Sequence, residues 1–293
     1  MFTLPADQSI CISTDTLVAG THFPTDCAAD IVAHRSMVAN LSDLAAMGAK
    51  PFAYTLALTL DSKSATHCWL EAFSSTLQAL GDHYEISLIG GNLAKGNLSL
   101  TYTVLGTVDN GRGIKRDGAQ VGDGIYVTGT LGNAAGGLKI VQSSNTEDFS
   151  DLVTSYNYPT PRIELGLALQ PIASSAIDIS DGFASDLTHI CERSVVGAQV
   201  ELDCLPLSAS LVSYVGAEQA QVLGLSGGDD YELCFTADPD QAEALRELSR
   251  QLEVPIHRVG TIVEMVAGKA LVSFHEATGA QVKINHLGYR HFK

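Results

Sequence analysis

Two aspartates and a serine stand close together in Asp178-Ile179-Ser180-Asp181, where an apolar run ends and a helix-like segment begins. An isolated buried carboxylate is costly, so carboxylates at the end of a strand usually hold a cation or accept hydrogen bonds. Carboxylate oxygens are also the ligands that magnesium prefers in proteins. We therefore expect Asp178 and Asp181 to bind metal and to form the catalytic centre.

The same residue types recur at three other places in the chain. Ser13-Thr14-Asp15 follows the apolar residues 10–12, Asp43 lies inside an apolar helical pattern, and residues 227–232 read Gly-Gly-Asp-Asp-Tyr-Glu. Four acidic motifs so far apart suggest several magnesium ions gathered around a polyphosphate. In such a site the protein mainly positions two anions and neutralises their charge.

The common phosphate-binding motifs are absent from the sequence. No G-x-x-x-x-G-K-[ST] loop occurs, and the glycine-rich run over residues 129–137 does not fit G-x-G-x-x-G with a following acidic residue. Protein-kinase motifs are missing as well. These absences favour a phosphoryl-transfer site built from aspartates and magnesium.

The overall composition is compatible with such a site and argues against other functions. A chain of 293 residues with 45% hydrophobic and 17% charged residues can bury a large core and is expected to form two domains. The net charge of −16 argues against nucleic acid or an anionic membrane as a partner. An anionic substrate would need metal ions or local basic residues.

The cysteines and the apolar runs indicate the compartment. The six cysteines form no C-x-x-C pair and no zinc-type spacing, so they are best explained as buried thiols in a reducing environment. No secretory leader pattern begins the sequence, and no apolar run reaches about 18 residues. We therefore expect a cytoplasmic protein.

Hydrophobic periodicity predicts the elements that position these motifs. In the first part of the chain it predicts helices over residues 30–48 and 65–83 and strands over 52–60, 86–89 and 98–106. Asp30 is expected to cap the first helix and Gly48 to end it. Turn-forming residues 109–113 predict a boundary between an N-terminal domain, residues 1–112, and a C-terminal domain, residues 113–293.

The second part of the chain also alternates between helix and strand patterns. A strand is predicted over residues 124–128, and further strands near positions 176, 200, 232 and 259. Helices are predicted over residues 162–169, 183–191, 218–222 and 239–252, and the polar residues 142–151 are expected to form a loop. The fold class is therefore α/β or α+β.

At this point a family resemblance becomes specific. The runs STDTLVAGTHF (13–23), NLSDLAAMG (40–48) and AIDISDG (176–182) resemble those of bacterial thiamine-monophosphate kinases. The run SGGDDYEL (226–233) and the tail GYRHF (288–292) fit the same family. The match covers essentially the whole chain in order. The TLVAG-x-HF run separates this family from relatives that make aminoimidazole ribonucleotide, selenophosphate or hydrogenase maturation intermediates.

The resemblance implies a function and an architecture. It implies ATP-dependent conversion of thiamine monophosphate to thiamine diphosphate by direct in-line transfer, with magnesium required. It also implies a homodimer in which the N-terminal α/β domains form a barrel across the two subunits, followed by a C-terminal α/β domain.

The resemblance also assigns roles to individual positions. Magnesium would be held by Ser13, Thr14, Asp15, Asp43, Asp178 and Asp181. ATP would be contacted by Gly91, Asn92, Arg116 and Ser180, and thiamine phosphate by His22, Asp229 and Tyr289. Asp186 is interpreted as a solvated helix residue and is not included in the site.

Two departures from the family pattern support an alternative hypothesis. Members of the family carry a Gly-Asp-Asp-Ala-Ala type motif shortly before the Ser-Thr-Asp strand, and the sequence starts at Met1, just after that place. This predicts a truncated N-terminal domain. Asn92 also stands where the family usually has aspartate. The alternatives are a catalytically weak or inactive homologue that binds nucleotide or thiamine phosphate, and a relative that acts on another small phosphate or carboxylate.

Overall fold

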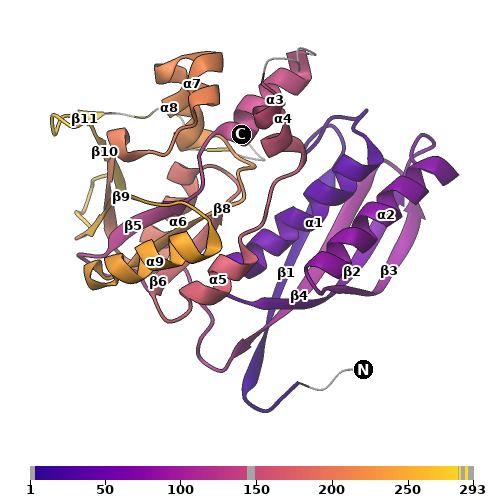
Figure 1. Ribbon diagram of the computed structural model, residues 1–293, viewed down its shortest axis with the longest axis horizontal. Coiled ribbons are helices and arrows are strands. Elements are labelled where there is room, and N and C mark those ends of the chain that lie inside the picture. The colour runs from indigo at the N-terminus through magenta and orange to yellow at the C-terminus, as the bar shows by residue number, and fades with distance from the viewer. Residues whose placement is uncertain (1–3, 144–148, 283, 285–287, 290–293) are drawn as a thin grey trace.

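The computed structural model describes residues 4–143, 149–282, 284 and 288–289. Two β-sheets with helices packed against them form two adjoining α/β units (Figure 1). The mixed α/β class predicted from the sequence is confirmed. The last three residues of the tail motif, 290–292, lie outside the described residues.

The first sheet has four strands in the order β1-β4-β2-β3. Its strands are β1 (Gln8–Val18), β2 (Lys50–Leu60), β3 (Ser87–Lys95) and β4 (Ser99–Asp109). The helices α1 (Ala29–Ala46) and α2 (His67–His83) cover one face (Figure 1). Alternation along β4 turns Leu100, Tyr102 and Val104 towards these helices, where they are fully buried.

The second sheet has seven strands in the order β11-β10-β7-β9-β5-β8-β6. These are β5 (Gly124–Thr128), β6 (Ala173–Ile179), β7 (Gly197–Glu201), β8 (Glu232–Ala237), β9 (Ile256–Val263), β10 (Val272–His275) and β11 (Gln281–Val282). The α-helices of this unit are α3 (Asn133–Ser143), α4 (Ser150–Asn157), α5 (Ile163–Leu169), α6 (Phe183–Ser194), α7 (Ala209–Val215), α8 (Ala217–Ser226) and α9 (Ala242–Leu252). Short 3-10 turns cover Leu202–Cys204 and Pro239–Gln241.

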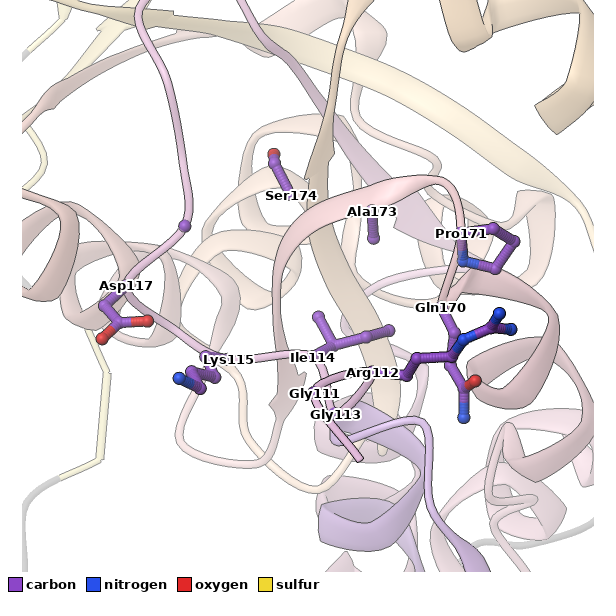
Figure 2. A pocket seen from close by; sticks show the side chains of 11 residues that line it. Gly111, Arg112, Gly113, Ile114, Lys115, Asp117, Gln170, Pro171, Ala173 and Ser174 are labelled. Carbon is purple, nitrogen blue, oxygen red and sulfur yellow. The ribbon is translucent and has the colours of Figure 1, made fainter. Parts of the chain in front are cut away.

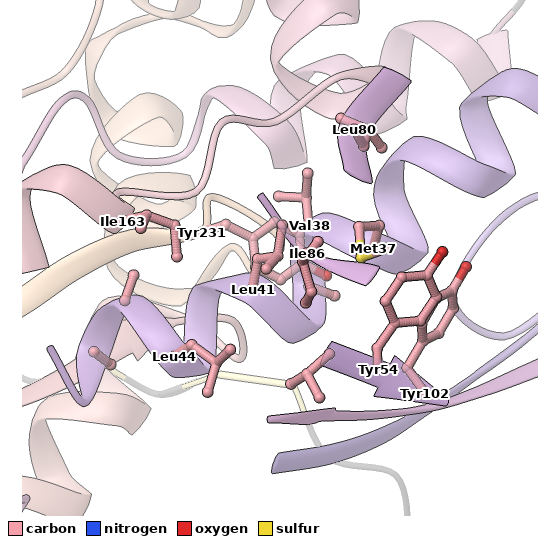
Figure 3. Packing of buried hydrophobic residues seen from close by; sticks show 14 of the residues in the cluster. Met37, Val38, Leu41, Leu44, Tyr54, Leu80, Ile86, Tyr102, Ile163 and Tyr231 are labelled. Atoms are coloured by element: carbon pink, nitrogen blue, oxygen red, sulfur yellow. The ribbon is translucent and has the colours of Figure 1, made fainter. Parts of the chain in front are cut away.

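Helix α1 belongs to the cores of both units. Its residues Val38, Leu41 and Leu44 pack in one buried cluster with Ile163 of α5 and Tyr231 (Figure 3). The approach of α5 is very close, because a Cβ atom on Gly166 would lie 2.0 Å from the carbonyl oxygen of Ala45. This contact fixes α1, and with it the acidic motif at its C-terminal end, against the second unit.

Several expectations about local structure were wrong. Asp30 does not cap α1, whose N-cap residue is Ala28 without a side-chain hydrogen bond. Strand β3 continues through the glycine pair to Lys95, because its ladder with β2 extends that far. The predicted loop over 142–151 overlaps the ends of two helices, since α3 reaches Ser143 and α4 starts at Ser150. Helix α7 was not predicted.

Two further expectations concern the compartment and the domain division. No helix within the described residues is long and apolar enough to cross a membrane. All six cysteines are free thiols, but the expectation that they are buried is confirmed only for Cys191 and Cys234 and is wrong for Cys68 and Cys204, which are exposed. The predicted boundary at residue 112 falls in the connector between β4 and β5 and stays a prediction.

Candidate active site

A cavity of about 870 Å³ lies at the junction of the two units. It is bounded by β1 and α1 from the first unit, and by the end of β6, the start of α6 and the segment before β8 from the second. Nine of the residues predicted from the sequence line it: Asp15, His22, Asp43, Arg116, Asp178, Ser180, Asp181, Asp229 and Tyr289. Motifs that are far apart in the sequence therefore meet in one place.

Asp43 and Asp178 form an enclosed acidic pair in the cavity. Asp43 stands near the end of α1, where its Oδ2 accepts a hydrogen bond of 2.5 Å from the hydroxyl of Ser13 on β1. Asp178 is buried at the end of β6. Among the described residues neither carboxylate forms an ion pair with a lysine, arginine or histidine.

The pKa values of both carboxyl groups are raised. Burial raises the pKa of Asp43, while the Ser13 hydrogen bond and the positive charge of Arg116 act in the opposite direction. Burial also raises the pKa of Asp178 well above its ordinary value, and the charges of Asp43 and Asp186 raise it further. The protein thus brings together negative charge that its own residues do not neutralise, which is the property of a cation site.

The turn that follows β6 is held by Asp186, which was not predicted as a site residue. Asp186, in the first turns of α6, is buried, and its Oδ2 accepts backbone N–H bonds from Ser180, Asp181 and Gly182 at 3.1–3.2 Å. Burial and the charge of Asp181 raise the pKa of Asp186 to about 7. The interpretation of Asp186 as a solvated helix residue was therefore wrong.

The segment before β8 is held in an unusual backbone conformation. Asp229 and Tyr231 have positive φ angles of 70° and 49°. The N–H of Asp229 donates to the carbonyl of Ser180, and the N–H of Tyr231 donates to the carbonyl of Ile179. Residues held in sparsely populated backbone regions are concentrated at functional sites. These bonds tie the predicted substrate-binding segment to the predicted metal-binding turn.

The carboxylate of Asp229 has two protein partners. Its Oδ2 lies 3.1 Å from Nη2 of Arg35, a fully buried residue of α1, and its Oδ1 accepts a 3.0 Å hydrogen bond from the hydroxyl of Tyr231. Arg35 was not identified from the sequence, because an arginine in a helical pattern ordinarily lies on the surface. The position of Arg35 five residues before Asn40 does not predict that Arg35 is buried either.

His22 and Tyr289 line the same cavity. The Nδ1 atom of His22 accepts a 3.0 Å hydrogen bond from the N–H of Val18, so in the neutral ring the proton is carried by Nε2. The N–H of Tyr289 donates to the carbonyl of Asp181, which brings Tyr289 beside the predicted metal-binding turn.

Four of the predicted positions do not line the cavity: Ser13, which contacts it only through its hydrogen bond to Asp43, and Thr14, Gly91 and Asn92. Strand alternation turns the side chain of Thr14 to the open face of the sheet, where its hydroxyl pairs with Thr103. Gly91 and Asn92 lie on β3, three strand spacings or about 14 Å from β1. Gly91 has a clear structural function, because a Cβ there would lie 2.0 Å from the carbonyl oxygen of Leu56. Their assignment to metal and ATP stays a prediction.

The carboxylates that line the cavity suit magnesium better than a metal ion whose ligands all come from the protein. Within the described residues no three His, Cys, Asp or Glu side chains are arranged to hold one metal ion. Magnesium is commonly bound by one or two carboxylates, with water and substrate phosphates as the other ligands. The paired carboxylates of Asp43 and Asp178, with Asp15 and Asp181 on the same cavity, fit that mode of binding.

A second cavity, of about 540 Å³, is lined by residues of the connector between the two sheets and by residues at the start of β6 (Figure 2). Arg112, Lys115, Asp117 and Gln170 are among its lining residues, and none of the predicted site residues is. Lys115 lines this cavity, and its neighbour Arg116 lines the acidic one. The connector thus directs one basic side chain to the cluster of aspartates.

Comparisons with known proteins agree with the order of the motifs. Residues 1–108 match the family model described as AIR synthase related protein, N-terminal domain, and residues 120–272 match the corresponding C-terminal domain. The chain is 45% identical to the thiamine-monophosphate kinase of Salmonella typhimurium over 296 residues, covering all of this chain and 89% of that protein. It is 43% identical to the Escherichia coli K12 enzyme with the same coverage.

Solved structures agree as well. The thiamine-monophosphate kinase of Stenotrophomonas maltophilia superposes with a TM-score of 0.89 at 41% identity, covering 96% of this chain and 89% of that one. A complex of AaThiL with AMPPCP and TMP superposes with a TM-score of 0.86 at 26% identity, covering 99% and 89%.

The two sheets, the acidic cavity between them and the two matched domain models define an AIR synthase-related protein. Within that class, the identity over the full length of the chain is decisive. The chain belongs to the thiamine-monophosphate kinase family.

The three N–H bonds to one oxygen of Asp186 predict a difference between two substitutions. In Asp186→Asn the amide oxygen can accept the same three bonds, so we expect activity within about tenfold of the wild type. In Asp186→Ala the turn loses its acceptor, and we expect a loss of about 100-fold, as is common for residues that orient metal ligands. Steady-state kinase assays at saturating magnesium measure both effects. An equal loss in the two variants would show that Asp186 is itself a metal ligand.

Proposed function

We propose that this protein transfers the γ-phosphoryl group of ATP directly to thiamine monophosphate, giving thiamine diphosphate. The observation that supports this most strongly is the meeting of four separate acidic motifs with Arg116 in a cavity that His22 and Asp229 also line. Membership of the thiamine-monophosphate kinase family gives the acceptor, and the cavity lies between two units where two substrates can enter.

The reaction needs charge neutralisation more than it needs a base. The second pKa of a phosphate monoester is about 6, so the acceptor is mostly ionised at neutral pH and a dedicated general base is unnecessary. Bringing two unit charges of the same sign to 4 Å costs about 1 kcal/mol in water and about 4 kcal/mol at the effective dielectric of a protein surface. A net charge of −16 on the chain makes this repulsion more severe.

Magnesium is proposed as the neutralising ion. Asp15, Asp43, Asp178 and Asp181 would hold several magnesium ions between them, each through one or two carboxylates, with the hydroxyl of Ser13 orienting Asp43. When bound, magnesium neutralises the phosphate oxygens of both substrates and orients them for displacement. Asp186 keeps the turn that carries Asp181 in place, through bonds to three successive N–H groups.

Different residues that line the cavity are proposed to contact the two substrates. Arg116 and Ser180 are proposed to contact ATP, because a guanidinium and a hydroxyl group recognise phosphate oxygens. His22, Asp229 and Tyr289 are proposed to contact thiamine monophosphate. His22 presents a donor at Nε2 in its neutral form, and Asp229 presents an acceptor.

A homodimer is proposed from the edges of the first sheet. Ile12 on β1 and Leu88 and Leu93 on β3 are 58%, 55% and 65% exposed, which is unusual for large apolar residues on edge strands. A barrel across the dimer would cover both edges. Within one chain, β4 and β2 separate β1 from the Gly-Gly-Asn segment of β3. A barrel across the dimer would allow this segment to contact the nucleotide.

Removing the charge of a metal-binding carboxylate should abolish turnover while keeping the shape of the side chain. We expect Asp178→Asn and Asp181→Asn each to lower the rate of thiamine diphosphate formation by about 100-fold or more. The exposed Asp82 gives a matched control, since Asp82→Asn should retain full activity. A coupled assay for thiamine diphosphate measures all three.

Wild-type turnover in Asp178→Asn and Asp181→Asn would contradict the assignment of the metal site. A wild-type protein that binds thiamine monophosphate and ATP without turnover would favour the alternative of an inactive binding homologue.

The dimer predicts the effect of a charge on β3. A two-fold axis repeats any substitution, so Leu93→Lys removes two buried leucines, worth about 3–6 kcal/mol together. We expect the dimer to weaken by at least about 100-fold and the variant to elute as a monomer at micromolar concentration. Val222→Lys on α8, where the side chain is also exposed, should stay dimeric. Light scattering that finds a soluble wild-type monomer would contradict the dimer.

A further inference from the structure

Arg35 lies directly behind the wall of the active-site cavity. Its side chain is 0% exposed, and it projects from α1 towards two residues that line the cavity, Tyr156 and Asp229. The guanidinium carbon lies 3.8 Å from the centre of the Tyr156 ring, and Nη1 donates to the carbonyl oxygen of the same residue. Arg35 thus touches the cavity wall without lining the cavity.

The charge of Arg35 is balanced by one carboxylate. Nη2 lies 3.1 Å from Oδ2 of Asp229, and among the described residues Nε and Nη2 have no acceptor in hydrogen-bond geometry. A buried guanidinium cannot lose its proton, so it needs a nearby negative charge. Asp229 therefore cannot turn away from Arg35 without leaving a buried cation unpaired.

Asp229 is also held from its other side. Its Oδ1 accepts a hydrogen bond from Tyr231, and its backbone adopts a positive φ of 70° that is fixed by the bond from its N–H to the carbonyl of Ser180. The side chain remains 31% exposed on the cavity. Each carboxylate oxygen can accept a second hydrogen bond, so the group is held in one orientation and can still bind a ligand.

This arrangement determines what kind of group Asp229 recognises. Because Arg35 already balances its charge, Asp229 is poorly suited as the counter-ion of a cationic ring. It is well suited as an oriented acceptor for N–H donors, such as the amino group of an aminopyrimidine. Phosphate groups have no donor at neutral pH and gain nothing from it.

We propose that Arg35 is a positioning residue that fixes Asp229 as a hydrogen-bond acceptor for the aminopyrimidine of the substrate. Arg35 thereby sets the affinity for thiamine monophosphate and leaves the affinity for ATP unchanged. This inference rests on the proposed function, since it concerns the substrate end of the same cavity.

The test compares KM values for the two substrates in the whole 293-residue chain. Arg35→Met keeps the bulk of the stem and removes the charge, so we expect KM for thiamine monophosphate to rise by about tenfold or more and KM for ATP to stay within about twofold. Arg35→Lys keeps the charge but lacks the planar guanidinium group. Its KM for thiamine monophosphate should therefore lie between those of the wild type and of Arg35→Met. In Arg35→Met/Asp229→Asn the rise should be less than the product of the single effects, because Arg35 acts through Asp229.

A matched control separates positioning from general loss of stability. Arg162 forms a similar enclosed ion pair with Glu232, at 2.5 Å, and does not line the active-site cavity. Arg162→Met should lower the melting temperature without changing either KM. Conversely, Arg35→Met/Asp229→Asn should melt above Asp229→Asn, because the second substitution removes the unpaired buried charge.

Three results would overturn the inference: an unchanged KM for thiamine monophosphate in Arg35→Met, an equal rise in both KM values, or the same rise in Arg162→Met. If Arg35→Met does not fold, Arg35→Lys decides by the same criteria. Failure of the proposed function is distinguishable, because it would leave the wild type without turnover. Calorimetric binding of thiamine monophosphate to the wild type and to Arg35→Met then decides the inference without turnover, and equal affinity would overturn it.

Discussion

The structure depends on an apolar contact that forces two carboxylates together. Helix α1 packs its apolar side into a core shared with α5 and β8, and the close approach at Gly166 leaves no room for adjustment. That packing brings Asp43, near the end of α1, against Asp178, at the end of β6. The fold accepts an electrostatic cost at this point because the surrounding apolar burial is large.

Other enclosed acidic groups are treated differently. Asp186 accepts three backbone N–H bonds, and Asp230, whose pKa burial raises to about 8, accepts two from Gly132 and Ala134 at the start of α3. Glu232 is paired with Arg162, and Asp229 with Arg35. Each of these groups is satisfied by the protein itself. Asp43 accepts a hydrogen bond from Ser13, but among the described residues neither Asp43 nor Asp178 forms an ion pair, and the two carboxylates lie against each other, which is why they mark the place for an external cation.

The residues that line the cavity could be predicted from the sequence better than the residues that hold them in position. Asp178 at the end of an apolar strand and Asp43 in an apolar helix stood out, because a carboxylate in such surroundings has few structural explanations. Asp186 and Arg35 could not be recognised, since their partners are backbone groups or side chains brought near only by tertiary packing. The distance of Gly91 and Asn92 from the cavity depends on the strand order β1-β4-β2-β3, which the hydrophobic pattern of single strands does not contain. Helix capping at Asp30 was wrong because Asp30 instead accepts a hydrogen bond from Tyr158.

Asp43 and Asp178 carry negative charge that a bound divalent cation would neutralise. Thermal unfolding with magnesium and with EDTA, from pH 5 to pH 8, measures this coupling. Because both pKa values are raised in the folded state, the folded protein binds more protons than the unfolded one, and stability without magnesium falls as the pH rises above the ordinary range of aspartate. Magnesium should offset this fall, so its stabilising effect should be small at pH 5, large at pH 8, and lost in Asp178→Asn. A magnesium effect that is the same at both pH values, or that persists in Asp178→Asn, would show that these two carboxylates do not bind the cation.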